Sequence, residues 1–315
     1  MKNTAQKYIE LKVNRDFGDI ITTYFEFLKQ NLKNFTNVFL NYNGIFLIGL
    51  LVVSYLLVSG VLGLIGHYDF GQDFSTMSGG EEAYYIYLVV GGILLVIIFM
   101  IVALLNYSLA AAYMIQYETL QGNHFDKRQV WNFFTRKIGS IFLFIVLLIG
   151  IYMAVSIVGI ILAIIPLVGV FAYYILLFFV LAWFGVSFFC LLNENKGVSE
   201  AFGEGWNLVT KNFWKSVGVN FVLGLLNGIL FFIVLIIPGI LLGVYTFHVV
   251  ENDVDVSSGM VPTIVYTLGT CMVLLISMYS QCLSQFVNGI LYYSLHEKLY
   301  NTHARSKIDQ IGNLE

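Results

Sequence analysis

Two groups of histidine and acidic residues have the side-chain types that bind divalent metal ions. They are His67 with Asp69 and Asp73, and His248 with Glu251 and Asp253. Imidazole and carboxylate together suit several divalent metals. The sequence contains no HxxxH or HExxH pair, and nothing in it brings the two groups together. An outward-facing metal enzyme is therefore one hypothesis, and solvated acidic loops are the simpler interpretation.

Motifs for other kinds of catalysis are missing from the sequence. It contains no G-x-S-x-G elbow, no Ser-x-x-Lys pair, no P-loop and no GxGxxG turn. Its three cysteines, Cys190, Cys271 and Cys282, are scattered through apolar stretches. This spacing favours neither a disulfide framework nor a zinc site. We therefore expect no enzymatic activity, no cofactor and no metal site.

Polar amides inside apolar stretches form two stripes. Gln281, Gln285 and Asn288 fall at i, i+4 and i+7, which places them on one face of a helix, and Asn220 and Asn227 are seven residues apart. An uncompensated amide in lipid is costly, so these side chains must face protein or water. They form a candidate intramembrane polar face. Its role is either hydrogen bonding between helices or a polar cavity for a ligand or lipid headgroup.

The composition shows what kind of structure must position these residues. The chain has 315 residues, of which 58% are hydrophobic and 11% are charged. Soluble domains are roughly 45–50% apolar and about 25% charged. A soluble fold of this size could not bury so much apolar surface. The sequence therefore predicts an all-α integral membrane protein and excludes disordered and nucleic-acid-binding proteins.

Long segments without charge predict six membrane-spanning helices, because each crossing needs about 20 apolar residues. The predicted spans are 45–66, 84–116, 139–164, 170–192, 216–237 and 263–296. Pro166 predicts the tight turn between the third and fourth spans. Pro238 leaves open whether residues 238–250 form a separate re-entrant or outer helix.

The basic residues predict the orientation of these spans. All 16 Lys and Arg lie before the first span, between the second and third, between the fourth and fifth, or after the sixth. The other connections, 67–83, 165–169 and about 251–262, carry seven carboxylates and no basic residue. Because basic loops stay in the cytoplasm, both termini are expected there.

An amphipathic, aromatic-rich stretch precedes each odd-numbered span, over about 17–33, 126–137 and 198–213; we call these stretches elbow helices. Their aromatic residues are expected at the membrane surface, with packing on protein as the alternative. The residues singled out are Phe17, Tyr24, Trp131, Phe202 and Trp206, together with Trp214 directly after the third stretch. We interpret the chain as one membrane domain of three elbow-helix-plus-hairpin repeats, about 14–122, 123–195 and 196–302, with a cytoplasmic tail over 303–315.

The third elbow helix and the residues before it carry a family resemblance. They are Leu191-Leu192-Asn193-Glu194, Gly197, Glu200-Ala201, Trp206 and Thr210-Lys211-Asn212-Phe213-Trp214. This pattern resembles the bacterial membrane domain attached to some glycerophosphoryl diester phosphodiesterases, which also occurs alone. The likeness is sharpest over about 185–230. It implies a bacterial inner-membrane module. In the family, catalysis belongs to a separate soluble barrel, so that activity is not expected here.

These observations predict a non-enzymatic, multi-pass inner-membrane protein that serves as a scaffold or accessory subunit of an envelope complex. The alternative is a lipid or amphiphile transporter or exporter component that uses the polar face of the sixth span. The expected partners are membrane lipids and either copies of the chain or other membrane-protein subunits, with no nucleic acid.

Overall fold

The structure of the chain is a computed structural model. It describes residues 8–67, 82–123, 125–165, 167–251 and 260–302, together with 305 and 308. These residues form eight α-helices and no strand. In chain order they are α1 (Phe17–His67), α2 (Glu82–Thr119), α3 (Lys127–Thr135), α4 (Ile138–Ala163), α5 (Val168–Asn193), α6 (Val198–Thr210), α7 (Phe213–Glu251) and α8 (Met260–Tyr300).

Six of the described helices are long and apolar enough to cross a membrane: α1, α2, α4, α5, α7 and α8. Even the shortest of them, α4 and α5, have 26 residues, which span about 39 Å at ~1.5 Å per residue. A hydrocarbon core is about 30 Å thick. The predicted fold class, an all-α integral membrane protein with six transmembrane helices, is confirmed.

Helix α1 joins the first elbow helix to the first predicted span without a break. The sequence predicts a surface helix over about 17–33 and a separate span over 45–66, but α1 is continuous through both. The Nδ2 atoms of Asn31 and Asn43 donate to backbone carbonyl oxygens four residues earlier, at 2.9 and 3.1 Å. Because both amides donate to the backbone of their own helix, they do not oblige it to break.

Helix α7 likewise continues past the proline at which the sequence left a break open. It is a single helix of 39 residues, so residues 238–250 extend α7 rather than forming a separate helix. A proline inside a transmembrane helix removes one backbone hydrogen bond. Neighbouring helices and small local adjustments of the backbone make that loss tolerable.

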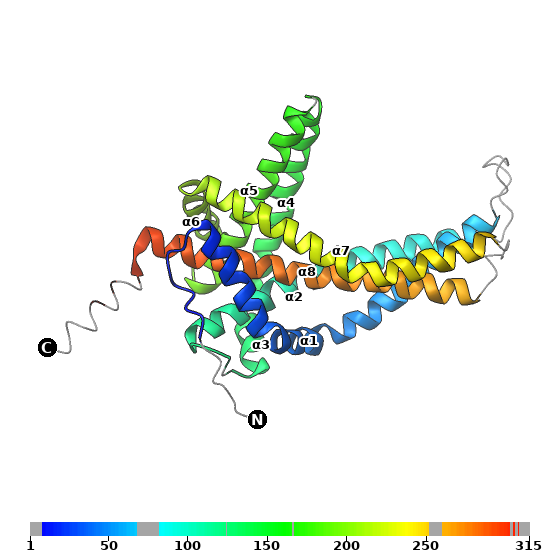
Figure 1. Cartoon of the computed structure of the whole chain (residues 1–315), viewed down its shortest axis with the longest axis horizontal. Coiled ribbons are helices and arrows are strands. Elements are labelled where there is room, and N and C mark those ends of the chain that lie inside the picture. The colour runs from blue at the N-terminus through cyan, green and yellow to red at the C-terminus, as the bar shows by residue number, and fades with distance from the viewer. Residues whose placement is uncertain are drawn as a thin grey trace. The chain divides into compact units, whose positions relative to one another are not determined.

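The chain divides into two compact units. Unit 1 comprises residues 1–38, 106–227 and 282–315, and unit 2 comprises 39–105 and 228–281. Helices α3 to α6 belong wholly to unit 1, whereas α1, α2, α7 and α8 contribute residues to both (Figure 1). The order of one short helix followed by two long ones occurs at α3–α4–α5 and at α6–α7–α8. The division of the chain into three repeats, about 14–122, 123–195 and 196–302, stays a prediction.

The second half of α5 forms the core of unit 1. Every residue from Phe184 to Leu192 is buried. Helix α6 approaches it so closely that a Cβ built at Gly205 would lie 2.0 Å from the Oγ and 2.8 Å from the Cα of Ser187. The rings of Phe144 in α4 and Phe202 in α6 stack nearby, with centroids 4.4 Å apart. The α5–α6 contact therefore requires a residue without a side chain at position 205.

A lysine just before α4 caps the C-terminal end of α5. The Nζ of Lys137 donates to the carbonyl oxygen of Leu192 at 2.6 Å and to that of Leu191 at 3.4 Å. The last carbonyls of a helix lack intrahelical donors and carry partial negative charge, so an ammonium group stabilises them. Burial of this ammonium lowers the pKa of Lys137 below its ordinary value. Lys137 thus holds the α3–α4 junction against α5.

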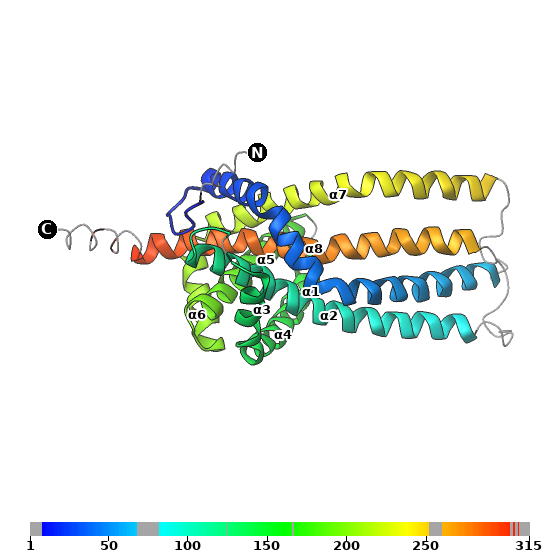
Figure 2. The ribbon, with the colours of Figure 1, turned by 90° about the horizontal axis from the view of Figure 1, so that it is seen from below.

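Unit 2 consists of four helix segments that lie side by side, one each from α1, α2, α7 and α8 (Figure 2). Helices α1 and α2 approach closely at a small residue, since a Cβ built at Gly60 would lie 2.7 Å from the Cγ of Leu88. Helices α7 and α8 are joined by a hydrogen bond between the hydroxyls of Thr246 and Tyr266, 2.7 Å apart. Small residues and hydroxyl groups are typical of packing between membrane helices.

Replacing Gly205 by alanine should destabilise the protein, whereas replacing Gly203 in the same helix should not. The new methyl group at position 205 requires the backbone of Ser187 to move, and overpacking of this kind typically costs about 1–3 kcal/mol. A Cβ at Gly203 meets no described atom within 4 Å. There the substitution only raises helix propensity, by about 1 kcal/mol.

Thermal unfolding of the purified protein in detergent would measure both effects. We expect a lower apparent melting temperature for Gly205→Ala and an unchanged or higher one for Gly203→Ala. Equal melting temperatures for the two variants would contradict the close packing of α5 and α6.

Candidate functional site

Two amides of the predicted polar face lie deep in unit 1. The side chains of Gln285 and Asn288 in α8 are fully buried, with 0% exposure. Asn288 packs against α5 at Gly185, where an added Cβ would lie 2.1 Å from the amide. None of the four amide atoms forms a hydrogen bond with a described residue. Because an unpaired buried amide costs about 1–3 kcal/mol, this part of α8 gains close packing at the expense of hydrogen bonding.

The amides of α7 have different neighbours. The Oδ1 of Asn227 accepts a hydrogen bond of 2.7 Å from the hydroxyl of Tyr24 in α1. The Nδ2 of Asn220 donates to the backbone carbonyl of Ser216, within α7 itself, at 3.2 Å. Among the described residues of unit 1, no hydrogen bond joins these amides to those of α8. Gln281, the remaining amide of the predicted face, belongs to unit 2 and is half-buried.

The aromatic residues predicted to lie at the membrane surface divide into two groups. Phe17, Trp206 and Trp214 are exposed, by 40%, 47% and 74%, whereas Tyr24 and Phe202 are buried and Trp131 is half-buried. The elbow helices therefore combine residues that pack within unit 1 with residues that face outward. Exposed tryptophan is typical of the interface between membrane and water, where we predict these residues to lie.

The predicted histidine and acidic groups fall largely outside the described residues. The structure does not describe Asp69, Asp73, Asp253 or the side chain of His67, so the outward-facing metal site stays a hypothesis. In the parts of the chain that are described, no three His, Cys, Asp or Glu residues are arranged to hold a metal ion.

A polar network joins the α5–α6 connection to the end of α8. The Nζ of Lys196 lies 2.6 Å from the Oε2 of Glu194 and 3.4 Å from the Oε2 of Glu204. From α8, the hydroxyl of Tyr292 donates to the Oε1 of Glu194 at 2.8 Å, and that of Tyr300 donates to the Oε1 of Glu204 at 2.6 Å. We call these five residues the Glu194–Glu204 network. Each of its four carboxylate oxygens has a partner, which is typical of a structural clamp.

The charges in this network support one another. Partial burial by itself would lower the pKa of Lys196, but the hydrogen bond with Glu194 and the charges of Glu194 and Glu204 outweigh it and raise that pKa above its ordinary value. The lysine therefore remains protonated at neutral pH and offsets one of the two carboxylates. The Nε2 of His296 lies 3.6 Å from the Oε1 of Glu194 and adds a further contact from α8.

The segment that precedes α1 also forms bonds with other parts of unit 1. The backbone nitrogen of Arg15 donates to the Oγ of Ser294 in α8 at 3.0 Å. The Nζ of Lys215 in α7 donates both to the carbonyl of Arg15 and to the Oγ of Ser294. An ion pair of 2.9 Å between Lys12 and Glu118 adds a contact with α2. This segment therefore ties three helices together.

Reasoning from the sequence did not identify the Glu194–Glu204 network. Glu194 was noted only within the family resemblance, and Tyr292 was not singled out. Glu194 and Lys196 lie two residues apart at the end of an apolar segment, and this spacing could have predicted their ion pair. The tyrosine partners were not predictable, because Tyr292 lies 98 residues from Glu194 in the chain.

Comparison with known proteins identifies no relative of the chain. No protein-family model matches the chain, and no curated protein or solved structure matches it. The resemblance to the membrane domain of glycerophosphoryl diester phosphodiesterases therefore stays a prediction from the residues of the third elbow helix.

Replacing Gln285 by methionine should leave the protein at least as stable as the wild type. Methionine is unbranched and of similar length, and replacing an unpaired buried polar group by an apolar one of similar shape is neutral or stabilising. Asn227→Leu is the contrasting variant, because it removes the hydrogen bond with Tyr24. That loss should cost about 0.6–2 kcal/mol.

Melting temperatures in detergent, with and without added lipid, would measure both variants. If Gln285→Met lowers stability more than Asn227→Leu does, the amide of Gln285 has a polar partner in solution. That result would contradict a purely packed contact between α8 and its neighbours.

Replacing Glu194 by alanine should destabilise the protein by about 1–3 kcal/mol. The substitution removes the hydrogen bond of the buried Tyr292 hydroxyl and the ion pair with Lys196. Glu26, an exposed glutamate in α1, provides the control, and its replacement by alanine should change stability by less than about 0.5 kcal/mol. Denaturant titration monitored by tryptophan fluorescence would compare them. Similar midpoints for both variants would show that the network does not contribute to stability.

Proposed function

We propose that this chain is a non-enzymatic protein of a bacterial inner membrane that acts as a scaffold or accessory subunit of an envelope complex. Its six apolar helices make it a multi-pass membrane protein. In the proposed role it contacts membrane lipids and associates with copies of itself or with other membrane-protein subunits. The family resemblance of the third elbow helix supports the bacterial inner membrane as its location.

The distribution of basic residues is the observation that carries the proposed orientation. All 16 Lys and Arg fall within the ranges of unit 1, and unit 2 contains none. These residues come from four separate stretches of the chain, and each stretch forms bonds within unit 1. The bonds include Lys12 with Glu118, Lys137 with Leu192, Lys196 with Glu194 and Lys298 with Asn212. Because basic residues remain on the cytoplasmic side, this grouping supports an orientation with both termini inside.

The burial of the α8 amides supports a scaffold role. A transport pathway needs polar side chains that a substrate or water can reach. Gln285 and Asn288 are instead enclosed, and Asn288 lies directly against the backbone of α5 at Gly185. We infer that these residues set the distance between helices and do not line a route across the membrane.

A lipid or amphiphile transporter or exporter component is the second candidate. The observation that favours it is the lack of hydrogen-bond partners for the Gln285 and Asn288 amides among the described residues. A polar headgroup admitted beside α8 would satisfy them. In that case Gln285→Met should abolish transport while the protein still folds, whereas a scaffold would tolerate the change.

Two reporter fusions would test both the orientation and the scaffold role. Green fluorescent protein attached after residue 315 should fluoresce, because that terminus is proposed to lie in the cytoplasm, where this reporter folds. The same reporter inserted within residues 67–83 should be dark. Purification through the fluorescent C-terminal tag in mild detergent should then recover a defined oligomer or stoichiometric membrane-protein partners.

The two readouts separate the parts of the proposal. A dark C-terminal fusion with a fluorescent 67–83 insertion would overturn the orientation. A bright fusion that purifies only as a monomer without partners would overturn the scaffold role and leave the orientation intact.

A further inference from the structure

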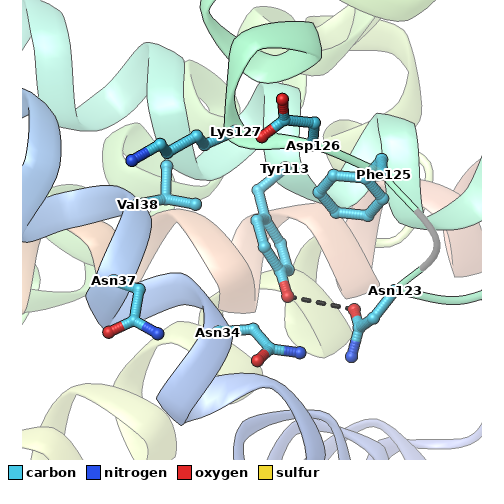
Figure 3. Close-up of a pocket in the computed structure, with 8 residues that line it drawn as sticks. All are labelled: Asn34, Asn37, Val38, Tyr113, Asn123, Phe125, Asp126 and Lys127. Atoms are coloured by element: carbon cyan, nitrogen blue, oxygen red, sulfur yellow. Dashed lines mark hydrogen bonds between the residues drawn. The ribbon is translucent and has the colours of Figure 1, made fainter.

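Unit 1 contains a small polar pocket beside the connection between α2 and α3. Its volume is about 250 Å³. It is lined by Asn34, Asn37 and Val38 of α1, Tyr113 of α2, and Asn123, Phe125, Asp126 and Lys127 of the connection and the start of α3 (Figure 3). Pockets for drug-sized molecules measure roughly 300–1,000 Å³. This pocket therefore suits a small polar group rather than a large ligand.

One side of the pocket carries amide groups that can donate hydrogen bonds. The side chains of Asn34 and Asn37 form no hydrogen bond with any residue in the described ranges. The hydroxyl of Tyr113 lies 3.0 Å from the Oδ1 of Asn123 and 3.1 Å from the Oδ1 of Asn31, which fixes the wall between α1 and the connection. In Figure 3 the three asparagines Asn34, Asn37 and Asn123 lie along one side of Tyr113.

The other side of the pocket carries two opposite charges. Asp126 and Lys127 are adjacent and exposed, and Figure 3 shows them across Tyr113 from the asparagines. They stand at the first turn of α3, a helix of nine residues whose N-terminal end has partial positive charge. A lysine, a helix N-terminus and amide groups favour a phosphate group, and a carboxylate beside them favours an ammonium group.

The chain positions of these residues indicate where the ligand comes from. Asn34 and Asn37 precede the predicted span 45–66, and the α2–α3 connection follows the predicted span 84–116. Under the orientation proposed above, on which this step depends, both segments lie at the cytoplasmic face of the membrane. Phospholipid headgroups are the phosphate esters present there at high concentration, and the apolar side chains of Val38 and Phe125 suit contact with the part of the lipid next to its headgroup.

We propose that this pocket binds a phosphoethanolamine group, with the phosphate facing Lys127, Asn34 and Asn37 and the ammonium facing Asp126, and that the group is the head of a phosphatidylethanolamine lipid. Phosphatidylglycerol lacks the ammonium, and phosphatidylcholine has one without hydrogen-bond donors. The pocket therefore selects among phospholipids through Asp126.

Native mass spectrometry of the full chain in detergent, titrated with each of the three lipids, would test the proposal. Phosphatidylethanolamine should bind most tightly. The double variant Asn34→Ala/Asn37→Ala and the single variant Lys127→Gln should each weaken its binding about tenfold, as expected for losing a hydrogen bond to a charged group. Asp126→Asn keeps a residue suited to the start of a helix and should abolish the preference over phosphatidylglycerol.

Neighbouring exposed residues provide the controls. Asn132→Ala and Arg128→Gln change an asparagine and a basic residue on α3 outside the pocket and should leave lipid binding unchanged. Equal binding of the three lipids, or an equal loss in the control variants, would overturn the proposal. Titration with soluble phosphoethanolamine would test whether the bound group comes from a membrane lipid or from a free compound. Binding of the soluble compound as tight as that of the lipid would overturn the assignment to a membrane lipid, and much weaker binding would support it.

These results are distinguishable from those of the reporter fusion. If the wild-type protein binds the three lipids equally while the fluorescent C-terminal fusion still recovers partners, the pocket proposal fails and the scaffold role stands. If the fusion shows the opposite orientation while the pocket variants still alter binding, the orientation and the cytoplasmic source of the lipid fail, and headgroup binding by the pocket stands.

Discussion

Close packing around the second half of α5 is the constraint on which unit 1 depends. Every residue of this stretch from Phe184 to Leu192 is buried, so each neighbouring helix must pack closely against it. The glycines at positions 185 and 205 bring α8 and α6 to van der Waals distance, and Lys137 satisfies the carbonyls at the end of the helix. Because the interior is densely packed, a shift of one neighbour would displace the others.

Charged groups surround this packed region at the ends of the helices. The Glu194–Glu204 network, Lys137 and the segment before α1 all connect chain stretches that the sequence places on the basic side of the membrane. Ionised groups are costly in hydrocarbon, whereas at helix ends they can be paired and partly hydrated. The same physical preference therefore explains both the sorting of lysines and arginines and the position of the network.

The asparagine and glutamine side chains show how one residue type serves several purposes in a membrane protein. Asn227 joins α7 to α1 by a hydrogen bond, Asn31 bonds back to its own helix, and Asn288 fills space against a glycine. Asn34 and Asn37 face a pocket instead. Asn31 and Asn288 are buried and Asn227 is half-buried, whereas Asn34 and Asn37 are exposed and therefore accessible to a headgroup.

The all-α class and the number of membrane-spanning helices followed from the sequence alone, because the length of an apolar segment and its lack of charge are local properties that decide whether it can cross a bilayer. The continuity of α1 was missed because the change from the amphipathic stretch 17–33 to the apolar span 45–66 does not by itself end a helix. The neighbour of Asn288 and the hydrogen-bond partner of Glu194 depended on tertiary structure. The residue that faces a polar side chain is set by the helix that packs opposite it. Gly185 faces Asn288 and Tyr292 bonds to Glu194, and in both pairs the residues lie far apart in the chain, so the sequence alone could not pair them.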